Sequence, residues 1–312
     1  MTINRLYSFN DIPKINTGSI KLDYVLNGGY PAGRIIEISG KESSNKSILA
    51  LHAIKQLQHN DGVSVYIDTD RKISNKYLSS IEIDPNKVYF AHPYSLDETI
   101  KITKSLLEQN FIDLIVIDNV SNLISEKNIN NKIINYDYKL QNNQFNNFLY
   151  KISSKAKLNN TTIIFINQYR TVITNNKAKT KPLYSKTFNR FAGLRLSIKK
   201  CYTIKTDLEY VGDNAEVKII KSPYYIKQPK VSFDIMYSSG IDNLREIIDL
   251  GLKLGIIQKS GAWYKMKDKV LGQGIEETKY TLLNDYNVLN NIITYIKEEE
   301  KDYEFIGQYT IK

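Results

Sequence analysis

The sequence predicts an α/β fold in which helices cover a mostly parallel central sheet, followed by a small α+β domain at the C-terminal end. Three observations support this prediction. Short apolar segments alternate with segments of helical spacing between residues 34 and 168. These apolar segments lack polar alternation, which is typical of strands buried on both faces of a parallel sheet. Beyond Gly240 the pattern changes to amphipathic helices around a short strand.

The expected elements follow one another in a regular order. The chain starts with a weakly patterned segment and a short capped helix at 17–26. Strands are then expected at 34–39, 63–68, 87–91, 111–118 and 161–168, with helices at 48–54, 96–109 and 142–157. Alternating strands at 195–198, 216–221 and 230–235 predict an antiparallel extension of the sheet. The C-terminal domain is expected to contain a helix at 241–251, a strand at 263–267 and a helix at 286–300.

Composition narrows the class of protein. The chain has 312 residues and a formal net charge of +10, which favours an anionic partner, with nucleic acid first. A general lysine bias is the alternative explanation. The single cysteine, Cys201, excludes an intrachain disulfide and fits a reducing compartment. Neither a signal peptide nor a membrane-spanning stretch is evident, so we expect a cytoplasmic protein without a membrane partner.

A phosphate-binding loop is predicted between the strand at 34–39 and the helix that follows. A loop that opens on glycine and ends in Lys-Ser, between a strand and a helix, is typical of a P-loop. Its backbone N–H groups and the helix N-terminus would face the phosphates. Lys46 would reach the β- and γ-phosphates, and the Ser47 hydroxyl would hold Mg²⁺. The residues expected to bind nucleotide here are Gly40, Lys41, Glu42, Ser43, Ser44, Asn45, Lys46 and Ser47.

This loop departs from the P-loop pattern at one position. The pattern has glycine immediately before the lysine, and this chain has Asn45. Asparagine is among the few other residues that tolerate a left-handed backbone, so the loop shape can survive the change. A serine-rich surface turn is the alternative interpretation.

Polar residues at the ends of other predicted strands support a nucleotide site. Asp70, Asp118 and Gln168 follow three of the apolar strands. Ligands of open α/β sheets bind at the carboxyl ends of the strands, where the loop also lies. An aspartate at the end of such a strand is where P-loop proteins place a further ligand of the Mg²⁺ shell. We therefore expect Ser47 and Asp118 to form the metal site.

Residues 170–200 are basic and contain no Asp or Glu. Tyr169, Tyr184, Phe188 and Phe191 are interleaved with the basic residues. Charge and aromatic rings on a long loop suit single-stranded nucleic acid, through phosphate contacts and base stacking. A solvated lysine-rich loop is the alternative. The expected DNA-binding residues are Arg170, Lys177, Lys179, Lys181, Lys186 and Arg190.

Further motifs lie in order along nearly the whole chain. They include Phe-Ile-Asn-Gln-Tyr-Arg at 165–170, Gly-Ala-Trp-Tyr at 261–264 and Gly-Gln-Gly at 272–274, besides Thr-Gly-Ser at 17–19. With these motifs the chain resembles the RecA family of bacterial homologous recombinases. The resemblance implies a RecA-type P-loop NTPase core at 17–240, after a short segment at 1–16, and a C-terminal domain at 241–312. The basic segment after Gln168 and the Gly-Ala-Trp-Tyr motif disfavour a P-loop kinase or a transporter ATPase.

The resemblance also implies an activity and its partners. Members bind ATP and Mg²⁺, form a filament on single-stranded DNA, pair it with homologous duplex DNA and promote strand exchange. An SOS repressor is a further partner implied by the family. The family resemblance assigns water activation to Asp70, γ-phosphate sensing to Gln168, adenine stacking to Tyr77, and contact with the neighbouring subunit's ATP to Lys221. Segments 125–140 and 170–193 correspond to the two DNA-binding loops.

Several departures from the family pattern favour an alternative function. Asp70 stands where the family has glutamate, so its carboxylate sits back by about 1.5 Å. Pro223 replaces a second interface lysine, and Tyr184-Ser185 replaces paired glycines. The N-terminal polymerisation helix is expected to be largely missing, and so is the acidic C-terminal tail. The alternative is a degenerate RecA-fold DNA-binding protein with little or no ATPase activity.

Overall fold

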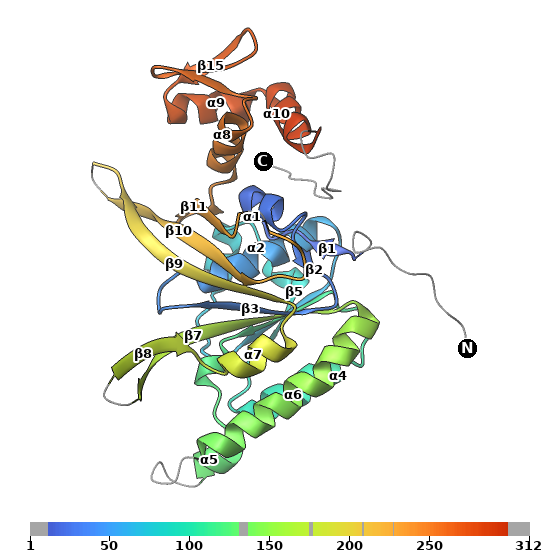
Figure 1. Ribbon diagram of the computed structural model, residues 1–312. Coiled ribbons are helices and arrows are strands. Elements are labelled where there is room, and N and C mark those ends of the chain that lie inside the picture. The colour runs from blue at the N-terminus through green and yellow to red at the C-terminus, as the bar shows by residue number, and fades with distance from the viewer. Residues whose placement is uncertain (1–11, 131–136, 175–176, 208, 227, 299–312) are drawn as a thin grey trace.

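The computed structural model describes residues 12–130, 137–174, 177–207, 209–226 and 228–298. It has the predicted α/β fold class: a large, mostly parallel sheet lies between two layers of helices, and a smaller α+β unit sits beyond one of these layers (Figure 1).

The parallel part of the large sheet has the strand order β9-β3-β7-β6-β4-β5. These strands are β3 (Ile35–Gly40), β4 (Ser64–Asp68), β5 (Val88–Ala91), β6 (Leu114–Asp118), β7 (Thr162–Thr174) and β9 (Leu194–Lys205). The phosphate-loop strand β3 lies between β9 and β7, so the loop leaves the interior of the sheet rather than its edge.

The remaining strands of this sheet are antiparallel to their neighbours. They are β10 (Tyr210–Lys221), β11 (Lys230–Met236), β12 (Gly240–Ile241) and β8 (Lys177–Pro182), which pairs with β7. The predicted antiparallel extension begins one strand later than expected, because residues 195–198 lie in β9 and pair with β3 in parallel. A separate ribbon pairs β1 (Lys14–Ile15) with β2 (Tyr30–Pro31).

Both faces of the large sheet are buried, as the apolar strands predict. On β3, Ile36 and Ile38 point into one core with Leu49 of a covering helix. Ile35, the residue before them, is on the opposite face of the strand and points into the other core with Phe148. The helices around the sheet are α1 (Ile20–Val25), α2 (Lys46–His59), α3 (Asn75–Ser80), α4 (Leu96–Leu106), α5 (Glu126–Asn130), α6 (Tyr138–Asn159) and α7 (Ser185–Phe191), with short 3₁₀ turns η2 (Pro85–Lys87) and η3 (Val120–Asn122).

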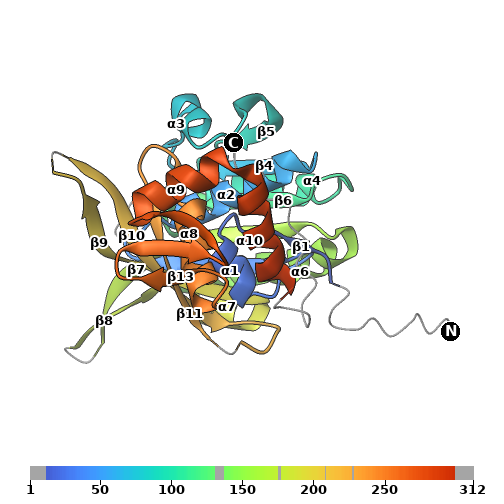
Figure 2. The ribbon, with the colours of Figure 1, turned by 90° about the horizontal axis from the view of Figure 1, so that it is seen from above.

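The C-terminal unit packs on α1, as the view from above also shows (Figure 2). Its elements are α8 (Asn243–Lys253), β13 (Gln258–Ser260), β14 (Trp263–Met266), β15 (Lys269–Gln273), α9 (Ile275–Asn284) and α10 (Tyr286–Glu298). Glu246 of α8 is fully buried and accepts hydrogen bonds from the Ser19 hydroxyl (2.5 Å) and the Ile20 N–H (2.7 Å). It therefore caps the N-terminus of α1 from across the junction. Burial raises the pKa of Glu246 to about 8.

Candidate nucleotide-binding site and basic segment

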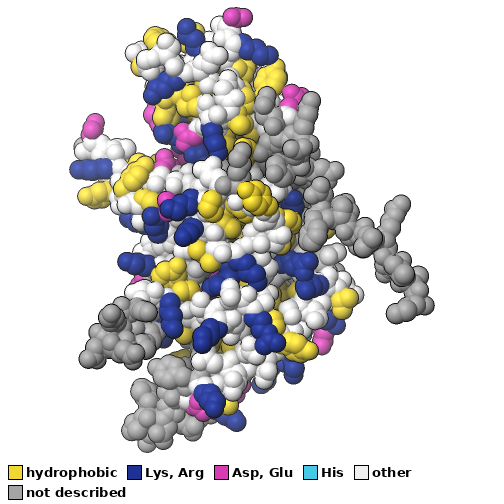
Figure 3. All heavy atoms as spheres, in the orientation of Figure 1, with side chains coloured by type: hydrophobic (Ala, Val, Ile, Leu, Met, Phe, Trp, Pro, Cys, Tyr) yellow, Lys and Arg dark blue, Asp and Glu magenta, His cyan; other side chains and the backbone are white. Residues whose placement is uncertain are grey.

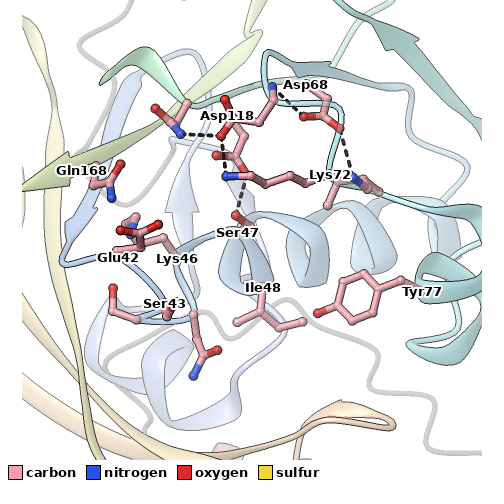
Figure 4. Close-up of a pocket in the computed structure, with 15 residues that line it drawn as sticks. Glu42, Ser43, Lys46, Ser47, Ile48, Asp68, Lys72, Tyr77, Asp118 and Gln168 are labelled. Carbon is pink, nitrogen blue, oxygen red and sulfur yellow. Dashed lines mark hydrogen bonds and ion pairs between the residues drawn. The ribbon is translucent and has the colours of Figure 1, made fainter. Parts of the chain in front are cut away.

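A cavity of about 430 Å³ opens at the carboxyl ends of β3, β4, β6 and β7 (Figure 4). Most of the residues predicted to bind nucleotide line it. These are Glu42, Ser43, Ser44, Asn45, Lys46, Ser47, Asp70, Tyr77, Asp118 and Gln168. The sheet thus brings together side chains that are up to 126 positions apart, from Glu42 to Gln168.

The loop has the backbone shape that the sequence predicts. Asn45 is left-handed (φ 63°) and serves as the N-cap residue of α2, and Ser43 is also left-handed (φ 52°). Gly40 lines no part of the cavity but has no room for a side chain. A Cβ there would lie 2.4 Å from the carbonyl oxygen of Ile198 and 2.5 Å from Ser44 Oγ. Glycine at the start of the loop is therefore required by close packing against β9.

Ser47 and Asp118 form the pair expected to bind a metal ion. Ser47 Oγ donates to Asp118 Oδ2 at 2.5 Å, and the Tyr66 hydroxyl donates to the same oxygen at 2.6 Å. Burial raises the pKa of Asp118, while these two hydrogen bonds act in the opposite direction. A hydroxyl and one carboxylate suit Mg²⁺, which takes few protein oxygens and keeps waters or phosphate oxygens as its other ligands. Within the described residues no cluster of three or more His, Cys, Asp or Glu could hold a metal ion.

Lys46 lies at the end of the loop, partly buried. Its ammonium donates to the carbonyl oxygen of Lys41 at 2.5 Å. Burial lowers the pKa of Lys46, and the nearby carboxylates of Asp118 and Glu42 oppose this shift. A cation in this position can exchange a carbonyl partner for a phosphate oxygen, a stronger charge-assisted hydrogen bond.

Asp70 is held by three donors that are not evident from the sequence. Its carboxylate accepts from Asn119 Nδ2 (3.0 Å), Asn122 Nδ2 (2.7 Å) and Lys72 Nζ (2.8 Å). Lys72 is only two residues from Asp70, which was the available signal. The two asparagines follow Asp118 in a chain rich in asparagine, so their type alone could not single them out. Together these donors fix where the short aspartate side chain points.

The two ends of the cavity differ in chemistry. Tyr77 and Ile48 lie together at one end, away from Gln168 (Figure 4). Ile73 also lines the cavity, so an apolar surface is available to a flat ring. At the other end, the backbone N–H of Gln168 donates to Ser121 Oγ at 2.7 Å, and Gln168 is only partly buried.

Besides Gly40, two residues predicted to bind nucleotide lie outside this cavity. Lys41 contributes only its carbonyl oxygen, which accepts from Ser44 Oγ (2.8 Å) as well as from Lys46. Lys221 lies on β10, and its ammonium donates to the carbonyl oxygens of Asn189 (2.9 Å) and Ala192 (2.6 Å) at the C-terminal end of α7. Within its own subunit Lys221 therefore closes a helix end.

The basic segment is not the long loop expected from its sequence. Strand β7 continues past Gln168 and pairs with β8, from Tyr169 opposite Pro182 to Thr174 opposite Lys177. Helix α7 follows directly. Arg170, Lys181, Lys186 and Arg190 are exposed on these elements, and Figure 3 shows Lys and Arg spread over the face that carries α7. Arg170 also donates to the carbonyl oxygen of Ser121.

The positions of the other predicted DNA contacts are given by the backbone. Lys177 and Lys179 lie in β8, opposite Thr174 and Val172. Segment 125–140 contains α5 and the start of α6, and its residues 131–136 lie outside the described part of the chain.

Two aromatic residues of the basic segment are core residues, contrary to the expectation that they stack on bases. Phe188 is fully buried, with its ring 5.5 Å from that of Phe145 and 5.4 Å from that of Phe165. Tyr184 is 8% exposed, stacks on Phe145 at 4.1 Å and accepts from Gln141 Nε2 at 2.6 Å. The composition of the segment predicted that these rings contact DNA. Instead they pack against Phe145 of α6 and Phe165 of β7.

The fold and the site define a P-loop α/β protein in which a basic hairpin and helix follow Gln168 of β7. Residues 2–242 match the RecA N-terminal domain family, and residues 245–301 match the RecA C-terminal domain family. The chain belongs to the RecA family. This membership associates it with DNA recombination and repair, DNA binding and ATP binding.

Several curated relatives are similar over most of the chain. A protein named Protein RecA from Chloroherpeton thalassium is 34% identical over 290 residues, which is 92% of this chain and 81% of the relative. Proteins of the same name from Campylobacter hominis and Helicobacter acinonychis are 35% and 36% identical, each over 92% of this chain and 84% of the relative. Among the described residues, no helix has the length and apolar character needed to cross a membrane.

Proposed function

We propose that this chain is an ATP-dependent DNA recombinase that binds single-stranded DNA, pairs it with homologous duplex DNA and promotes strand exchange. The proposal rests on one observation: Lys46, Ser47, Asp70, Asp118 and Gln168 line a single cavity at the strand ends. Of these, Gln168 lies on the strand that continues into the exposed basic hairpin. The residues proposed for nucleotide chemistry and those proposed for DNA contact are therefore connected by one strand, β7.

In the proposed mechanism each side chain of the cavity has one task. The loop N–H groups and Lys46 hold the phosphates, while Ser47 and Asp118 would hold Mg²⁺. The metal ion, when bound, neutralises charge that develops on the phosphate oxygens. Asp70 orients the attacking water, and its three donors keep its carboxylate in a defined place. Tyr77 packs against the adenine ring.

Coupling to DNA is proposed to run through η3. Ser121 accepts the Gln168 N–H through its hydroxyl and the Arg170 guanidinium through its carbonyl oxygen. A change at Gln168 on γ-phosphate binding would therefore move the turn that also positions Arg170. Asn122, in the same turn, donates to Asp70. DNA on the basic segment can in this way alter the position of the catalytic carboxylate.

We further propose a set of assembly properties from the family. The chain would form a filament in which Lys221 approaches the neighbouring subunit's ATP, releasing the end of α7 to do so. Residues 17–240 would act as the ATPase core and residues 241–312 as a separate domain, after a short segment at 1–16. An SOS repressor is a candidate protein partner, and the cytoplasm is the expected location.

The decisive experiment measures phosphate release with and without single-stranded DNA, using Lys46→Ala as the control. We expect DNA-stimulated release that the Lys46→Ala variant lacks, with a loss on the order of a hundredfold, because one positioned charge donor contributes that much to a transition state. Release no faster than that of Lys46→Ala, at every DNA and ATP concentration, would remove the ATPase function.

A second candidate function is a DNA-binding protein of the same fold with little ATPase activity. The observation that favours it is that three donors already occupy the Asp70 carboxylate, which leaves fewer of its lone pairs to hold a water. A misplacement of the water of about 1 Å can cost a hundredfold in rate. In the experiment above, this candidate predicts DNA binding that persists without any phosphate release.

A further inference from the structure

Asn45 adopts the backbone conformation of the glycine it replaces, and its side chain is tied to a distant strand. Its φ of 63° lies in the left-handed region, which is disfavoured for residues that carry a Cβ. As the N-cap residue of α2 it makes no capping hydrogen bond. Instead its Nδ2 donates to Asp213 Oδ2 on β10 at 3.2 Å, across 168 positions of the sequence. The side chain thus adds a tether that glycine could not provide.

Asp213 is buried, and its carboxylate is held in place by several partners. It is 4% exposed, and its Oδ1 accepts from the Tyr237 hydroxyl (2.9 Å) and pairs with Lys200 Nζ (2.5 Å). Burial by itself would raise the pKa of Asp213, but the hydrogen bonds from Lys200, Asn45 and Tyr237 lower it below the ordinary value. Strands β9 and β10 and the residue that follows β11 thereby fix one carboxylate beside the phosphate loop.

The charge of Asp213 also needs an explanation. A carboxylate beside a loop that receives a polyanion would weaken binding by repulsion. Lys200 cancels that charge locally at 2.5 Å, so the carboxylate can hold Asn45 without opposing phosphates. No side chain of this group is among the residues predicted from the phosphate-loop pattern except Asn45 itself.

We infer that Asp213 is a positioning residue of the nucleotide site, which holds Asn45 and with it the loop in the left-handed shape that a glycine would adopt unaided. Lys200 balances its charge. The inference rests on the proposed function, because the loop is taken to bind a nucleoside triphosphate. It also explains how the loop keeps its shape without the glycine of the pattern. The hydrogen bond to Asp213 offsets the cost of the left-handed backbone at Asn45.

The test is a double-mutant cycle on nucleotide affinity, measured by titrating the full chain with a fluorescent ATP analogue and Mg²⁺. We expect Asn45→Ala and Asp213→Asn each to weaken binding about tenfold, since a hydrogen bond to a charged group is of that size. Asn45→Gly should bind within about threefold of the unaltered protein, because glycine adopts the left-handed shape without a tether. Asp213→Asn should have almost no effect in the Asn45→Gly background.

The cycle separates the tether from a simple charge effect. Removing the Asp213 charge has the same effect on affinity whether residue 45 is Asn or Gly, so this effect cancels in the cycle. The hydrogen bond contributes only where Asn45 is present. Asp234→Asn is the matched control. It removes the same kind of carboxylate, one that accepts from Asn214 Nδ2 at 2.7 Å one register position from Asp213, and should leave affinity unchanged. Equal losses from Asp213→Asn in both backgrounds would overturn the inference.

Two further measurements keep the inference decidable. If Asp213→Asn does not fold, Asn45→Ala and Asn45→Gly carry the test, and equal affinities for these two variants would overturn it. If the unaltered protein binds no nucleotide, the proposed function fails. Hydrogen exchange of the loop amides 41–47 without nucleotide then decides the inference, which requires faster exchange in Asp213→Asn than in Asp234→Asn and fails if the two are equal.

Discussion

The nucleotide cavity and the basic segment share strand β7, but they are built differently. In the cavity, the functional side chains come from the parallel strands, from the loops that follow these strands and from the helices that follow the loops, so their positions follow from the sheet. In the basic segment, residues of opposite character alternate on short elements, with Lys186 exposed and Phe188 buried on the same helix turn. The first region shows that strand order can assemble chemistry from distant positions. The second shows that composition alone does not say which side chains are free to meet a ligand.

The largest expected effect tests the aromatic residues of the basic segment. Because Phe188 packs between Phe145 and Phe165 with no exposure, Phe188→Ala should lower the free energy of unfolding by about 3–5 kcal/mol. Phe191, which is only partly buried, is the matched control, and its replacement by Ala should cost about 1 kcal/mol. Urea unfolding followed by circular dichroism measures both. If Phe188→Ala instead kept its stability and lost DNA binding, Phe188 would be a base-stacking residue. The stated difference between the two regions would then be wrong.

The difference between the two regions also explains what could be predicted from the sequence. The loop at 40–47 and the strand-end residues Asp118 and Gln168 were predictable because apolar strands and a glycine-lysine-serine spacing are local signals. The Asn45–Asp213 bond joins residues 168 positions apart, and no local pattern encodes it. The donors to Asp70 were equally hidden, because they depend on how the chain turns after β6.

In the basic segment the local signals were misleading for a physical reason. Helix α7 has seven residues and its N-cap residue, Tyr184, is left-handed, so the segment offers neither a full amphipathic repeat nor a side-chain cap. Its fold depends on tertiary contacts. One is the buried pair of Arg195 with Glu37 of β3 (2.5 Å), in which Arg195 also contacts Ser185 at the start of the helix. Such a contact appears only once β3 and β9 are known to be neighbours.

A position outside both regions supplies the next prediction. Glu246 joins α8 to α1, with Lys21 and Asp23 as the nearby charged groups. Its pKa is raised from 4.5 to about 8 on folding, so between these values the folded state binds more protons than the unfolded state. Stability should therefore fall as pH rises through this window, by at most about 1.4 kcal/mol per pH unit from this group.

The Glu246→Gln variant tests this assignment, because glutamine resembles the neutral acid at every pH. We expect thermal unfolding from pH 6 to pH 9 to show a flatter decline for Glu246→Gln than for the unaltered protein, with the variant the more stable at pH 9. Nucleotide affinity and DNA affinity at fixed pH should not change, since neither region contains Glu246. Parallel stability curves for the two proteins would contradict the assigned pKa and its cause.

The smallest expected effect concerns the exposed cations of the basic segment. Each lysine or arginine that neutralises a phosphate of single-stranded DNA contributes about 0.7 to the slope of log affinity against log salt. Lys186→Gln and Arg190→Gln should therefore each reduce the slope by about that amount, and their double variant by about twice as much. Lys265→Gln, on the exposed face of β14 in the C-terminal unit, is the charge-matched control and should leave the slope unchanged. The slope is measured by fluorescence anisotropy of a labelled oligonucleotide between about 50 and 200 mM salt. Electrostatic affinity changes strongly over this range. An unchanged slope for both variants would mean that these two cations only face solvent and do not contact DNA. Helix α7 would then contribute no side chain to DNA binding, in contrast to the cavity, whose side chains converge on one site.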